Sequence, residues 1–545
     1  MSRHVPKHTP PKHTLPKHPQ LLLPRSRRQL LRTGLLGGGV AALGFGGLLL
    51  PRPSLAALDR PVIGHGVQSG DIGADGGVVW ARVDRPARMI VNYATTESFK
   101  DARRVVGPAA LDITDFTARA ILQGLPAGQD VFYRVQFEDL ADLKILSEPV
   151  SGRFRTAPAG KRDITFVWSG DVVGQGWGIN PEVGGMTIWK EMASLNPDFF
   201  IHSGDSIYAD GVVQPKVTLP NGKVWTNIVT EEKSKVAETL SDYRGNYRYN
   251  LMDENLRSFN ASVPILAQWD DHETRNNWYP QQILDDDRYK IKSLALLSAN
   301  ASRAWHEYMP IRLDANRPEQ VYRVIHYGPS LDVFMLDQRS YRGDNSKDLQ
   351  DKPGADTAFM GPAQIRWLKQ ALLASNATWK VLASDMPLGL GVPDKQKDGT
   401  LNFEAIANQD DGPAKGRELE LADLLRFIKQ NGIVNTVWLT ADVHYTAAHY
   451  YNPDKAKFQD FAPFWEFVSG PLNAGTYGPN KLDGTFGPEL KFVKAPAAGQ
   501  ENLSPMDEMQ FFGHVRIDGA TEVMTVTLKD LKNRDLYKID LTPAA

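Results

Sequence analysis

Apolar and polar residues alternate along short runs between about residue 64 and residue 158. Gly, Pro and Asp separate these runs, which occupy residues 78–83, 89–93, 117–122 and 131–137. A period of two residues is typical of β-strands with one buried face. Tyr133, near the start of the last run, resembles the tyrosine corner of sandwich domains. We therefore predict a small all-β domain over residues 60–157, of the immunoglobulin-like or fibronectin-like kind.

The pattern changes after Lys161. Short apolar runs of strand length now alternate with longer segments at residues 364–373 and 419–428, whose apolar residues recur at helical spacing. Strands that alternate with helices are typical of layered α/β domains. We assign residues 161–545 to this second, α/β domain.

The first 56 residues have the order of an export signal. Arg27 and Arg28 precede an uncharged run at residues 34–50, of which seven of 17 are Gly, and small residues follow at 54–56. This order is typical of a signal peptide, and the paired arginines resemble a twin-arginine signal. The alternative is a membrane anchor, but a spanning helix needs about 20 residues. We expect the twin-arginine export machinery to deliver a periplasmic or secreted protein without a permanent membrane anchor.

Charge is distributed unevenly along the chain. Residues 1–56 hold nine of the 62 Lys and Arg and none of the 64 Asp and Glu, so the formal charge of −2 becomes −11 without them. Such an acidic body lacks the basic excess of a nucleic-acid-binding protein. The chain has no Cys, which excludes disulfides, thiolate metal sites and a thiol nucleophile.

Five apolar runs after Lys161 end in a carboxylate. The residues concerned are Asp171, Asp205, Asp271, Asp337 and Asp442. His272 and His444 lie within two positions of the third and fifth. A single Asp after a strand is ordinary turn chemistry. Five of them indicate a shared site, because α/β sheets place ligands at the carboxyl ends of their strands.

Carboxylates that lie a few Å apart raise one another's pKa values, and a bound cation relieves that repulsion. Oxygen ligands with one or two His suit hydrolytic sites that hold two metal ions. In such sites a bridging carboxylate joins the ions, and the pair generates hydroxide near neutral pH. The strand ends therefore predict a two-metal hydrolase.

Several motifs occur in a fixed order along the second domain. They are Gly204-Asp205 with Tyr208, Trp-Asp-Asp-His-Glu at 269–273, Leu-Asp-Gln-Arg-Ser-Tyr-Arg-Gly at 336–343, Met-Gly-Pro-Ala-Gln at 360–364, Trp-Lys-Val-Leu at 379–382, Asp-Val-His at 442–444 and Ser-Gly-Pro-Leu-Asn-Ala-Gly at 469–475. This order resembles the PhoD-type alkaline phosphatase/phosphodiesterase family of the metallophosphoesterase superfamily. The resemblance covers nearly the whole chain after residue 56. It implies a β-sandwich core flanked by helices, with a small all-β domain before it.

The resemblance also implies a set of metal ligands. Asp205 would bridge both metals, and Tyr208 would be a phenolate ligand, which needs a strongly polarising ion. That requirement suits ferric iron, the ion that the resemblance implies, accompanied by calcium. The remaining implied ligands are Asp171, Asp271, Asn276, Asp442 and His444. The alternatives are a core aromatic role for Tyr208 and a turn role for Asn276.

One position departs from the family. Relatives often supply a Cys thiolate at the end of the first strand, where this chain has Asp171. A carboxylate still holds ferric iron, because both are hard, but it changes the iron's colour and redox potential. The hydrolytic interpretation is unaffected, while the identity of the metal pair stays open.

Three further residues are candidates for contact with substrate. Arg339 and Arg342 follow the fourth strand, and a guanidinium clamps phosphate in bidentate fashion; the alternative for each is a structural arginine. His272 is a candidate to protonate the leaving group or hold the substrate, or else to support a ligand from behind.

These observations predict an exported alkaline phosphatase. It would use a metal-activated hydroxide on phosphomonoesters, phosphodiesters or both, in small molecules or polymers. One alternative is a phosphodiesterase for phospholipids or polymers, similar to a phospholipase D. Another is a surface-binding protein without catalysis, which the intact metal motifs disfavour.

Overall fold

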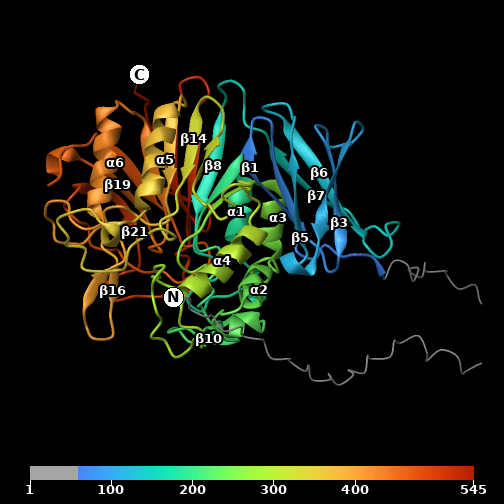
Figure 1. Ribbon diagram of the computed structural model, residues 1–545, viewed down its shortest axis with the longest axis horizontal. Helices are drawn as coiled ribbons and strands as arrows, with labels where there is room; N and C mark the ends of the chain where they lie inside the picture. Colours follow the sequence, from blue (N-terminus) through green and yellow to red (C-terminus); the bar gives the residue numbers. More distant parts are fainter. Residues whose placement is uncertain (1–58, 545) are drawn as a thin grey trace, which may run out of the picture. The chain divides into compact units, whose positions relative to one another are not determined.

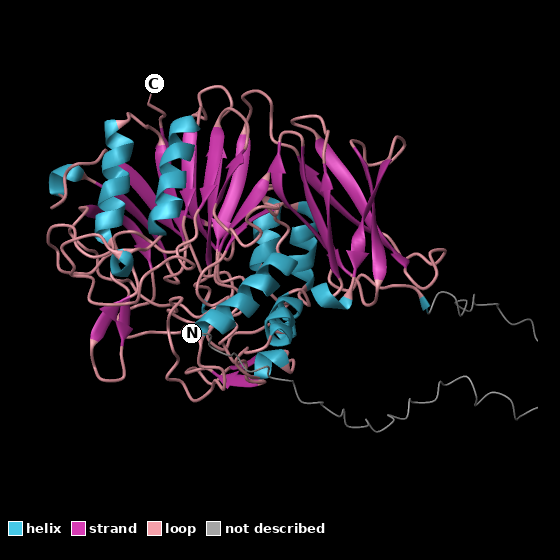
Figure 2. Ribbon diagram, in the orientation of Figure 1, coloured by secondary structure: helices cyan, strands magenta, loops and turns pink. Residues whose placement is uncertain are grey.

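Three β-sheets organise residues 59–544, the part of the chain that the computed structural model describes (Figures 1 and 2). The predicted export signal at residues 1–56 lies outside the described residues. The largest sheet has nine strands in the order β24-β23-β22-β8-β9-β12-β1-β2-β5. Its strands are β1 (Val67–Gly73), β2 (Gly76–Arg82), β5 (Thr117–Leu122), β8 (Ile164–Ser169), β9 (Phe199–Ser203), β12 (Ile265–Gln268), β22 (Phe511–Ile517), β23 (Met524–Asp530) and β24 (Asp535–Leu541).

A second sheet has seven strands in the order β13-β14-β15-β18-β20-β19-β21. They are β13 (Arg323–His326), β14 (Leu331–Met335), β15 (Trp379–Ala383), β18 (Thr436–Thr440), β19 (Thr446–Tyr451), β20 (Phe464–Val468) and β21 (Pro488–Lys494). Two short hairpins, β10 (Lys216–Thr218) with β11 (Val224–Thr226) and β16 (Pro393–Lys395) with β17 (Leu401–Phe403), extend from loops.

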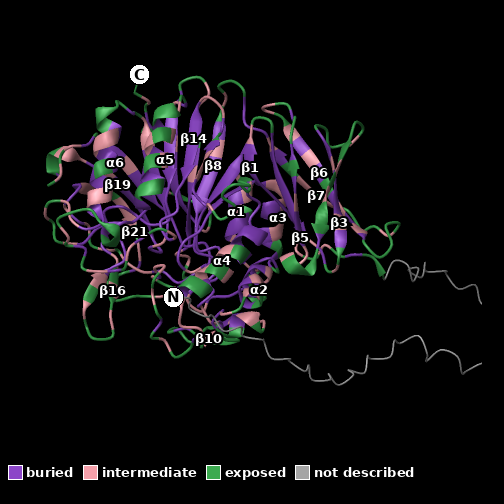
Figure 3. Ribbon diagram, in the orientation of Figure 1, coloured by how far each residue is buried: buried purple, intermediate pink, exposed green. Residues whose placement is uncertain are grey.

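The two large sheets pack face to face, and helices cover their outer faces. Along β8, Phe166 and Trp168 point to the core between the sheets, whereas Val167 points to the helices on the other side. In the second sheet, Val333 faces that core and Phe334 faces its own helices. Strands that are buried on both faces appear in the sequence as continuous apolar runs. These four layers bury the sheets almost completely (Figure 3).

Within residues 59–544, six α-helices form the two outer layers. Four lie against the nine-stranded sheet, namely α1 (Ile188–Ser194), α2 (Leu240–Asn250), α3 (Glu254–Ser262) and α4 (Leu294–Tyr308). Two lie against the seven-stranded sheet, namely α5 (Gly361–Ala374) and α6 (Glu418–Gln430). Both helical segments predicted from spacing fall within α5 and α6. Among residues 59–544, no helix is long and apolar enough to cross a bilayer.

The N-terminal region is all β. Its third sheet has the order β4-β3-β6-β7, from β3 (Ala87–Ala94), β4 (Arg103–Ala110), β6 (Asp130–Asp139) and β7 (Val150–Arg155). This sheet packs on β1, β2 and β5 around a core of its own. The predicted fold class, an all-β region followed by an α/β sandwich core with flanking helices, is thus confirmed.

One sheet joins the two regions, however. The sequence predicts separate domains, whereas β1 pairs with β12 in parallel, with Gly70 opposite Ile265. A Cβ atom at Gly70 would lie 2.4 Å from the carbonyl oxygens of Ile265 and Pro310, so only glycine allows this approach. Single-sequence periodicity cannot reveal such a pairing, because it depends on residues almost 200 positions apart.

Candidate metal centre

Parallel strands of both large sheets end on one site. β8, β9 and β12 are parallel neighbours in the first sheet, and β14, β15 and β18 are parallel neighbours in the second. Asp171, Asp205 and Asp271 follow the first three strands, and Asp442 follows β18. Carboxyl ends of parallel strands lie at the same edge of a sheet, which explains why residues so distant in sequence meet here.

Three overlapping groups of side chains have the geometry to hold a cation. They are Asp171 with Asp205 and His444, Asp205 with Asp271 and His272, and Asp270 with Asp271 and Asp442. Within each group, one potential ligand atom of every residue lies within 4.8 Å of the others. Asp205 and Asp271 each belong to two groups, and a carboxylate shared between groups is the arrangement expected of a bridging ligand.

Unusual backbone geometry accompanies these side chains. Asp171, Asp205, Asp442 and His444 all have positive φ, between 50° and 68°. Non-glycine residues adopt this conformation at a cost of about 1–3 kcal/mol, and they cluster at functional sites. Gly470 contributes space, because a Cβ atom there would lie 2.0 Å from Asp171 Oδ2.

Tyr208 and His444 face each other at the centre of the site. The Tyr208 hydroxyl lies 2.7 Å from His444 Nε2, and the other ring nitrogen of His444 contacts the Gly475 carbonyl. A carbonyl only accepts, so Nδ1 carries the proton and the Nε2 lone pair points into the site. Burial lowers the pKa of His444 to about 4, which keeps it neutral. Burial and the Asp205 carboxylate raise the pKa of Tyr208 well above its usual value.

His272 is held from three sides. Its Nδ1 lies 2.6 Å from Asp210 Oδ1, its backbone N–H donates to Asp205 Oδ1 at 3.0 Å, and its ring lies 4.2 Å from that of Tyr208. The second Asp210 oxygen accepts from the Asn276 backbone. Although burial opposes it, the Asp210 carboxylate raises the pKa of His272 well above its usual value.

Arg339 is buried inside a ring of carboxylates. Its Nε donates to Asp270 at 2.7 Å and to Asp385 at 3.1 Å, its Nη1 contacts Glu404, and its Nη2 lies 3.4 Å from Asp442. The side chain is entirely inaccessible to solvent. The predicted phosphate clamp is therefore not what this geometry offers, because every face of the guanidinium that reaches the site already contacts a carboxylate.

Arg342 also lies away from the pocket. Its guanidinium is fully buried, contacts the Glu404 backbone carbonyl and lies 4.6 Å from the centre of the Phe359 ring. Burial and the neighbouring Arg417 lower the pKa of Arg342 well below its usual value. This environment is that of a structural arginine, the alternative weighed from the sequence, because the guanidinium is fully buried against Glu404 and Phe359 and does not line the pocket at the metal centre.

Asp337 follows a strand, as predicted for the shared site, but it does not join the other carboxylates. Its two oxygens accept from the Trp269 indole and from the Ser340 backbone and hydroxyl, so this residue closes a turn. Asp385, two residues after β15, joins the site instead through Arg339. The same sequence pattern precedes both residues, and only the hydrogen bonds distinguish them.

Asp210 and Glu273 are functional residues that the sequence analysis missed. Glu273 is fully buried and accepts from the backbone N–H groups of Asp205, Ser206 and Asp270, which fixes two strand ends at once. Glu273 lies inside the motif at 269–273, and Asp210 lies two residues after Tyr208. A buried carboxylate within two residues of a ligand is the signal that points to such support.

The site residues open into a pocket of about 390 Å³, whose wall includes Asn276 together with five other candidate ligands, Asp205, Tyr208, Asp271, Asp442 and His444. Both oxygens of Asp171 and one of Asp271 are buried without a hydrogen-bond partner. Burial, and then the neighbouring carboxylates, raise the pKa of Asp171 well above its usual value. Buried carboxylates without partners fit bound cations, since burying an unpaired charge is costly. No thiolate is available to any of them.

Comparisons with known proteins agree with this arrangement. The family profile described as "PhoD-like phosphatase" matches residues 166–528, and "PhoD-like phosphatase, N-terminal domain" matches residues 51–158. Alkaline phosphatase D of Bacillus subtilis (strain 168) is 29% identical over 440 residues, which cover 76% of this chain and 70% of that protein.

Solved structures share the fold. A structure of PhoD is 21% identical with a TM-score of 0.64, covering 89% of this chain and 93% of that one. The purple acid phosphatase PPD1 from yellow lupin (Lupinus luteus) seeds is 12% identical with a TM-score of 0.53, covering 89% of this chain and 74% of that one. The profile matches, the relative and the clustered carboxylates together lead to one conclusion: the chain belongs to the PhoD-like phosphatase family and is a phosphoesterase.

Proposed function

We propose that the protein is an exported, metal-dependent alkaline phosphatase that hydrolyses phosphomonoesters, phosphodiesters or both. The observation that carries this proposal is the convergence of Asp205, Asp271, Asp442 and His444 on one pocket, with Asp171 buried behind them beside Asp205 and His444 and with carboxylate oxygens left unpaired. In a phosphatase of this family, a bound pair of metal ions best explains why these donor atoms lie together.

The residues divide naturally between two ions. Asp171, Tyr208 and His444 would hold one, Asp271, Asn276 and Asp442 the other, and Asp205 would belong to both. A phenolate and two carboxylates favour a trivalent hard ion such as Fe³⁺, and an all-oxygen set favours Ca²⁺. When bound, such a pair supplies Lewis acidity and lowers the pKa of water.

His272 would act as the proton donor in this scheme. Asp210 holds Nδ1, so Nε2, which lies 3.8 Å from Asp271 Oδ1, is the nitrogen left to face a substrate in the pocket. A protonated Nε2 would donate to the ester oxygen as the P–O bond breaks, which lets the alcohol leave in neutral form. Asp210 also fixes the ring orientation, so the proton is offered at one defined atom.

The pocket leaves room for either class of ester. A volume of about 390 Å³ accommodates a phosphate with one organic substituent, and its mouth opens to solvent beside Asn276, Asn277 and Asn480. A phospholipid or polymer phosphodiester is the second candidate function, because the mouth is open and polar. Export by the twin-arginine machinery to the periplasm or beyond completes the proposal.

Hydrolysis of 4-nitrophenyl phosphate and bis(4-nitrophenyl) phosphate by the protein without residues 1–56 tests the proposal. Activity should fall on chelation and return when iron and calcium are restored together. The ratio of the two rates ranks monoesterase against diesterase function. Turnover that is indifferent to chelation, in protein verified to be metal-free, would refute the metal-dependent mechanism.

A further inference from the structure

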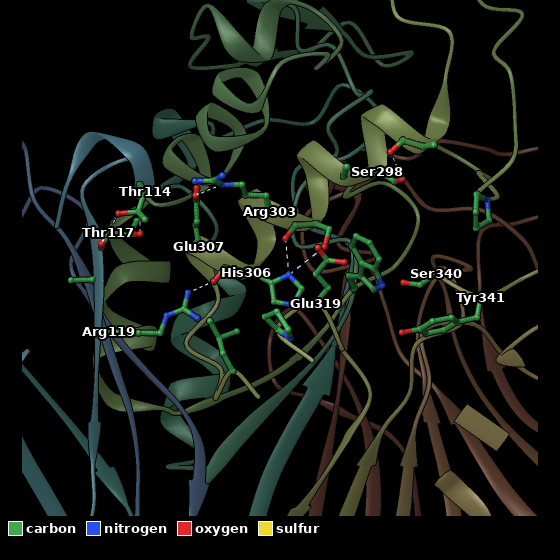
Figure 4. A pocket seen from close by; sticks show the side chains of 18 of the residues that line it. Thr114, Thr117, Arg119, Ser298, Arg303, His306, Glu307, Glu319, Ser340 and Tyr341 are labelled. Carbon is green, nitrogen blue, oxygen red and sulfur yellow. Dashed lines mark hydrogen bonds and ion pairs between the residues drawn. The ribbon is translucent and has the colours of Figure 1, made fainter. Parts of the chain in front are cut away.

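A second cavity, separate from the metal centre, lies where the N-terminal strands meet α4. It measures about 800 Å³, and its wall includes Arg119 of β5, His306 of α4 and Tyr341 (Figure 4). Figure 4 shows Arg119 reaching toward His306 on one side, with Ser340 and Tyr341 across the cavity. This volume suits a small organic ligand.

Charges around the cavity floor are unbalanced. The carboxylates that act electrostatically on Arg119 are those of Glu307 and Asp71. Glu307 already binds Arg244 at 2.6 Å and Arg303 at 3.0 Å, and Asp71 binds Arg323 at 2.7 Å. Four guanidinium groups therefore share two carboxylates, and among the described residues none forms an ion pair with Arg119. The one carboxylate elsewhere on the wall, Glu319, is exposed at the rim.

One terminal nitrogen of Arg119 donates a hydrogen bond, and the other has no acceptor. Its Nη2 donates to the His306 carbonyl at the C-terminus of α4, which is a favourable place for a cation. Its Nη1 is buried without a partner. Capping of α4 explains the position of Nη2, but it does not explain why Nη1 is buried without an acceptor. A buried donor without a partner costs stability unless a ligand supplies one.

His306 offers the complementary group. Its Nδ1 lies 2.7 Å from the Ser302 carbonyl, and because a carbonyl only accepts, Nδ1 carries the proton. Burial lowers the pKa of His306 to about 4, so the ring is neutral at pH 7. Nε2 is then an acceptor, and it too has no partner. One donor and one acceptor, both unpaired, thus lie beside the same cavity.

We propose that this cavity is a second ligand site, for a small organic anion that also carries a hydroxyl group. The anionic group, a carboxylate or phosphate, would lie over Arg119, and the hydroxyl would donate to His306 Nε2. Both protein atoms are shielded from water in the free protein, so binding includes a rotation of these side chains, as is common at ligand sites. This site is independent of the phosphatase reaction.

Direct binding of D-glycerate to the metal-loaded protein tests the proposal, because glycerate carries a carboxylate and hydroxyls and no phosphate ester. Calorimetry or saturation-transfer NMR measures binding without any use of activity. We expect millimolar affinity, weakened at least about tenfold by Arg119→Met. Since that variant also loses the α4 cap, Ala299→Trp, which fills the cavity from an exposed position on its α4 wall, provides a second test.

Two controls separate this site from the metal centre. Leu296→Trp lies on the exposed surface of the same helix and outside the cavity wall, so it should bind glycerate like the unaltered protein. Asp205→Asn should also retain binding. The proposal is overturned if the unaltered protein does not bind glycerate, or if Asp205→Asn abolishes binding while Ala299→Trp preserves it.

Discussion

The carboxylates at the strand ends form two adjoining groups that differ in what neutralises them. Around Arg339, the chain supplies its own cation, which contacts Asp270, Asp385, Glu404 and Asp442. Around Asp205, no lysine or arginine of the described residues forms an ion pair with the carboxylates, and several oxygens have no partner. Asp442 belongs to both groups, since it contacts Arg339 and is also a candidate metal ligand, whereas Asp171, Asp205 and Asp271 form no ion pair with any lysine or arginine among the described residues.

Within this one cluster of carboxylates, those around Arg339 therefore have a structural role, and those around Asp205 are the candidates for a catalytic role. A guanidinium is always charged and cannot exchange, so it holds the second sheet against the first permanently. A metal ion can bind a substrate oxygen, which a fully enclosed guanidinium cannot. The following predictions test this division, from the largest expected effect to the smallest.

Loss of Asp205, the proposed bridging carboxylate, should abolish metal binding and catalysis at the site. Asp205→Asn removes one charge and one ligand from two of the cation-binding groups at once. Loss of a ligand's outer partner alone costs about 10–100-fold, so we expect activity to fall by more than about a hundredfold. Metal content by mass spectrometry should fall in parallel, while circular dichroism stays unchanged. A variant with full metal content and normal turnover contradicts the bridging role.

Removal of Arg339 should affect folding before activity. Arg339→Met leaves four buried carboxylates without their cation, and breaking a buried ion pair costs about 3–5 kcal/mol. Chemical denaturation measures the free energy of unfolding. Arg342→Met is the matched control, since Arg342 is equally buried but has its nearest carboxylate, Glu404, at 3.7 Å. An equal loss in free energy of unfolding in the two variants would mean that the ring of carboxylates around Arg339 does not account for its contribution to stability.

Asp210→Asn should weaken catalysis while leaving the metals in place. The amide keeps the shape but no longer stabilises a charged His272, whose Nδ1 lies 2.6 Å away. We expect kcat to fall by about 10–100-fold. The loss should be greater for alkyl phosphates than for nitrophenyl phosphates, because a poor leaving group depends more on protonation. An identical loss for both substrates argues for a purely structural role.

Glu418 shows a third way to neutralise a buried carboxyl group, by a proton. It lies fully buried at the start of α6, and burial, then the nearby Asp483 carboxylate, raise its pKa to about 9. Because the folded pKa exceeds the usual 4.5, the group's contribution to stability is present below pH 4.5 and is lost as pH rises toward 9. The folded protein should therefore become less stable across that interval.

Glu418→Gln should remove this dependence. We expect the variant to match the unaltered protein near pH 5 and to exceed its free energy of unfolding by about 1–3 kcal/mol near pH 9. Thermal denaturation at several pH values measures the difference. Asp423→Asn, on the exposed side of the same helix, should show no such divergence. A constant difference at every pH contradicts the protonated state of Glu418.

Local patterns in the sequence determined much of the fold. Alternation at residues 78–83 and 117–122 predicted strands that the structure contains, and helical spacing predicted α5 and α6. These elements follow from which faces of a segment are apolar, a property that short stretches of sequence carry. Motif order is equally informative, because it indicates the family without reference to any tertiary contact.

The candidate ligands were also predictable as residues. Asp171, Asp205, Asp271, Asp442 and His444 each follow a strand, and the structure brings all five together. The sequence could not distinguish Asp337 from Asp385, since both follow an apolar strand. That distinction depends on which neighbours donate hydrogen bonds, and those neighbours come from other strands.

Only the tertiary structure decided the roles of the arginines and the joining of the two regions. Arg339 and Arg342 are both strand-end cations in the sequence, yet both are buried away from the pocket. Whether a charge meets solvent, a carboxylate or a substrate depends on packing between distant segments. For the same reason the pairing of β1 with β12, through Gly70 and Ile265, is invisible to local pattern and fixed by the assembled sheet.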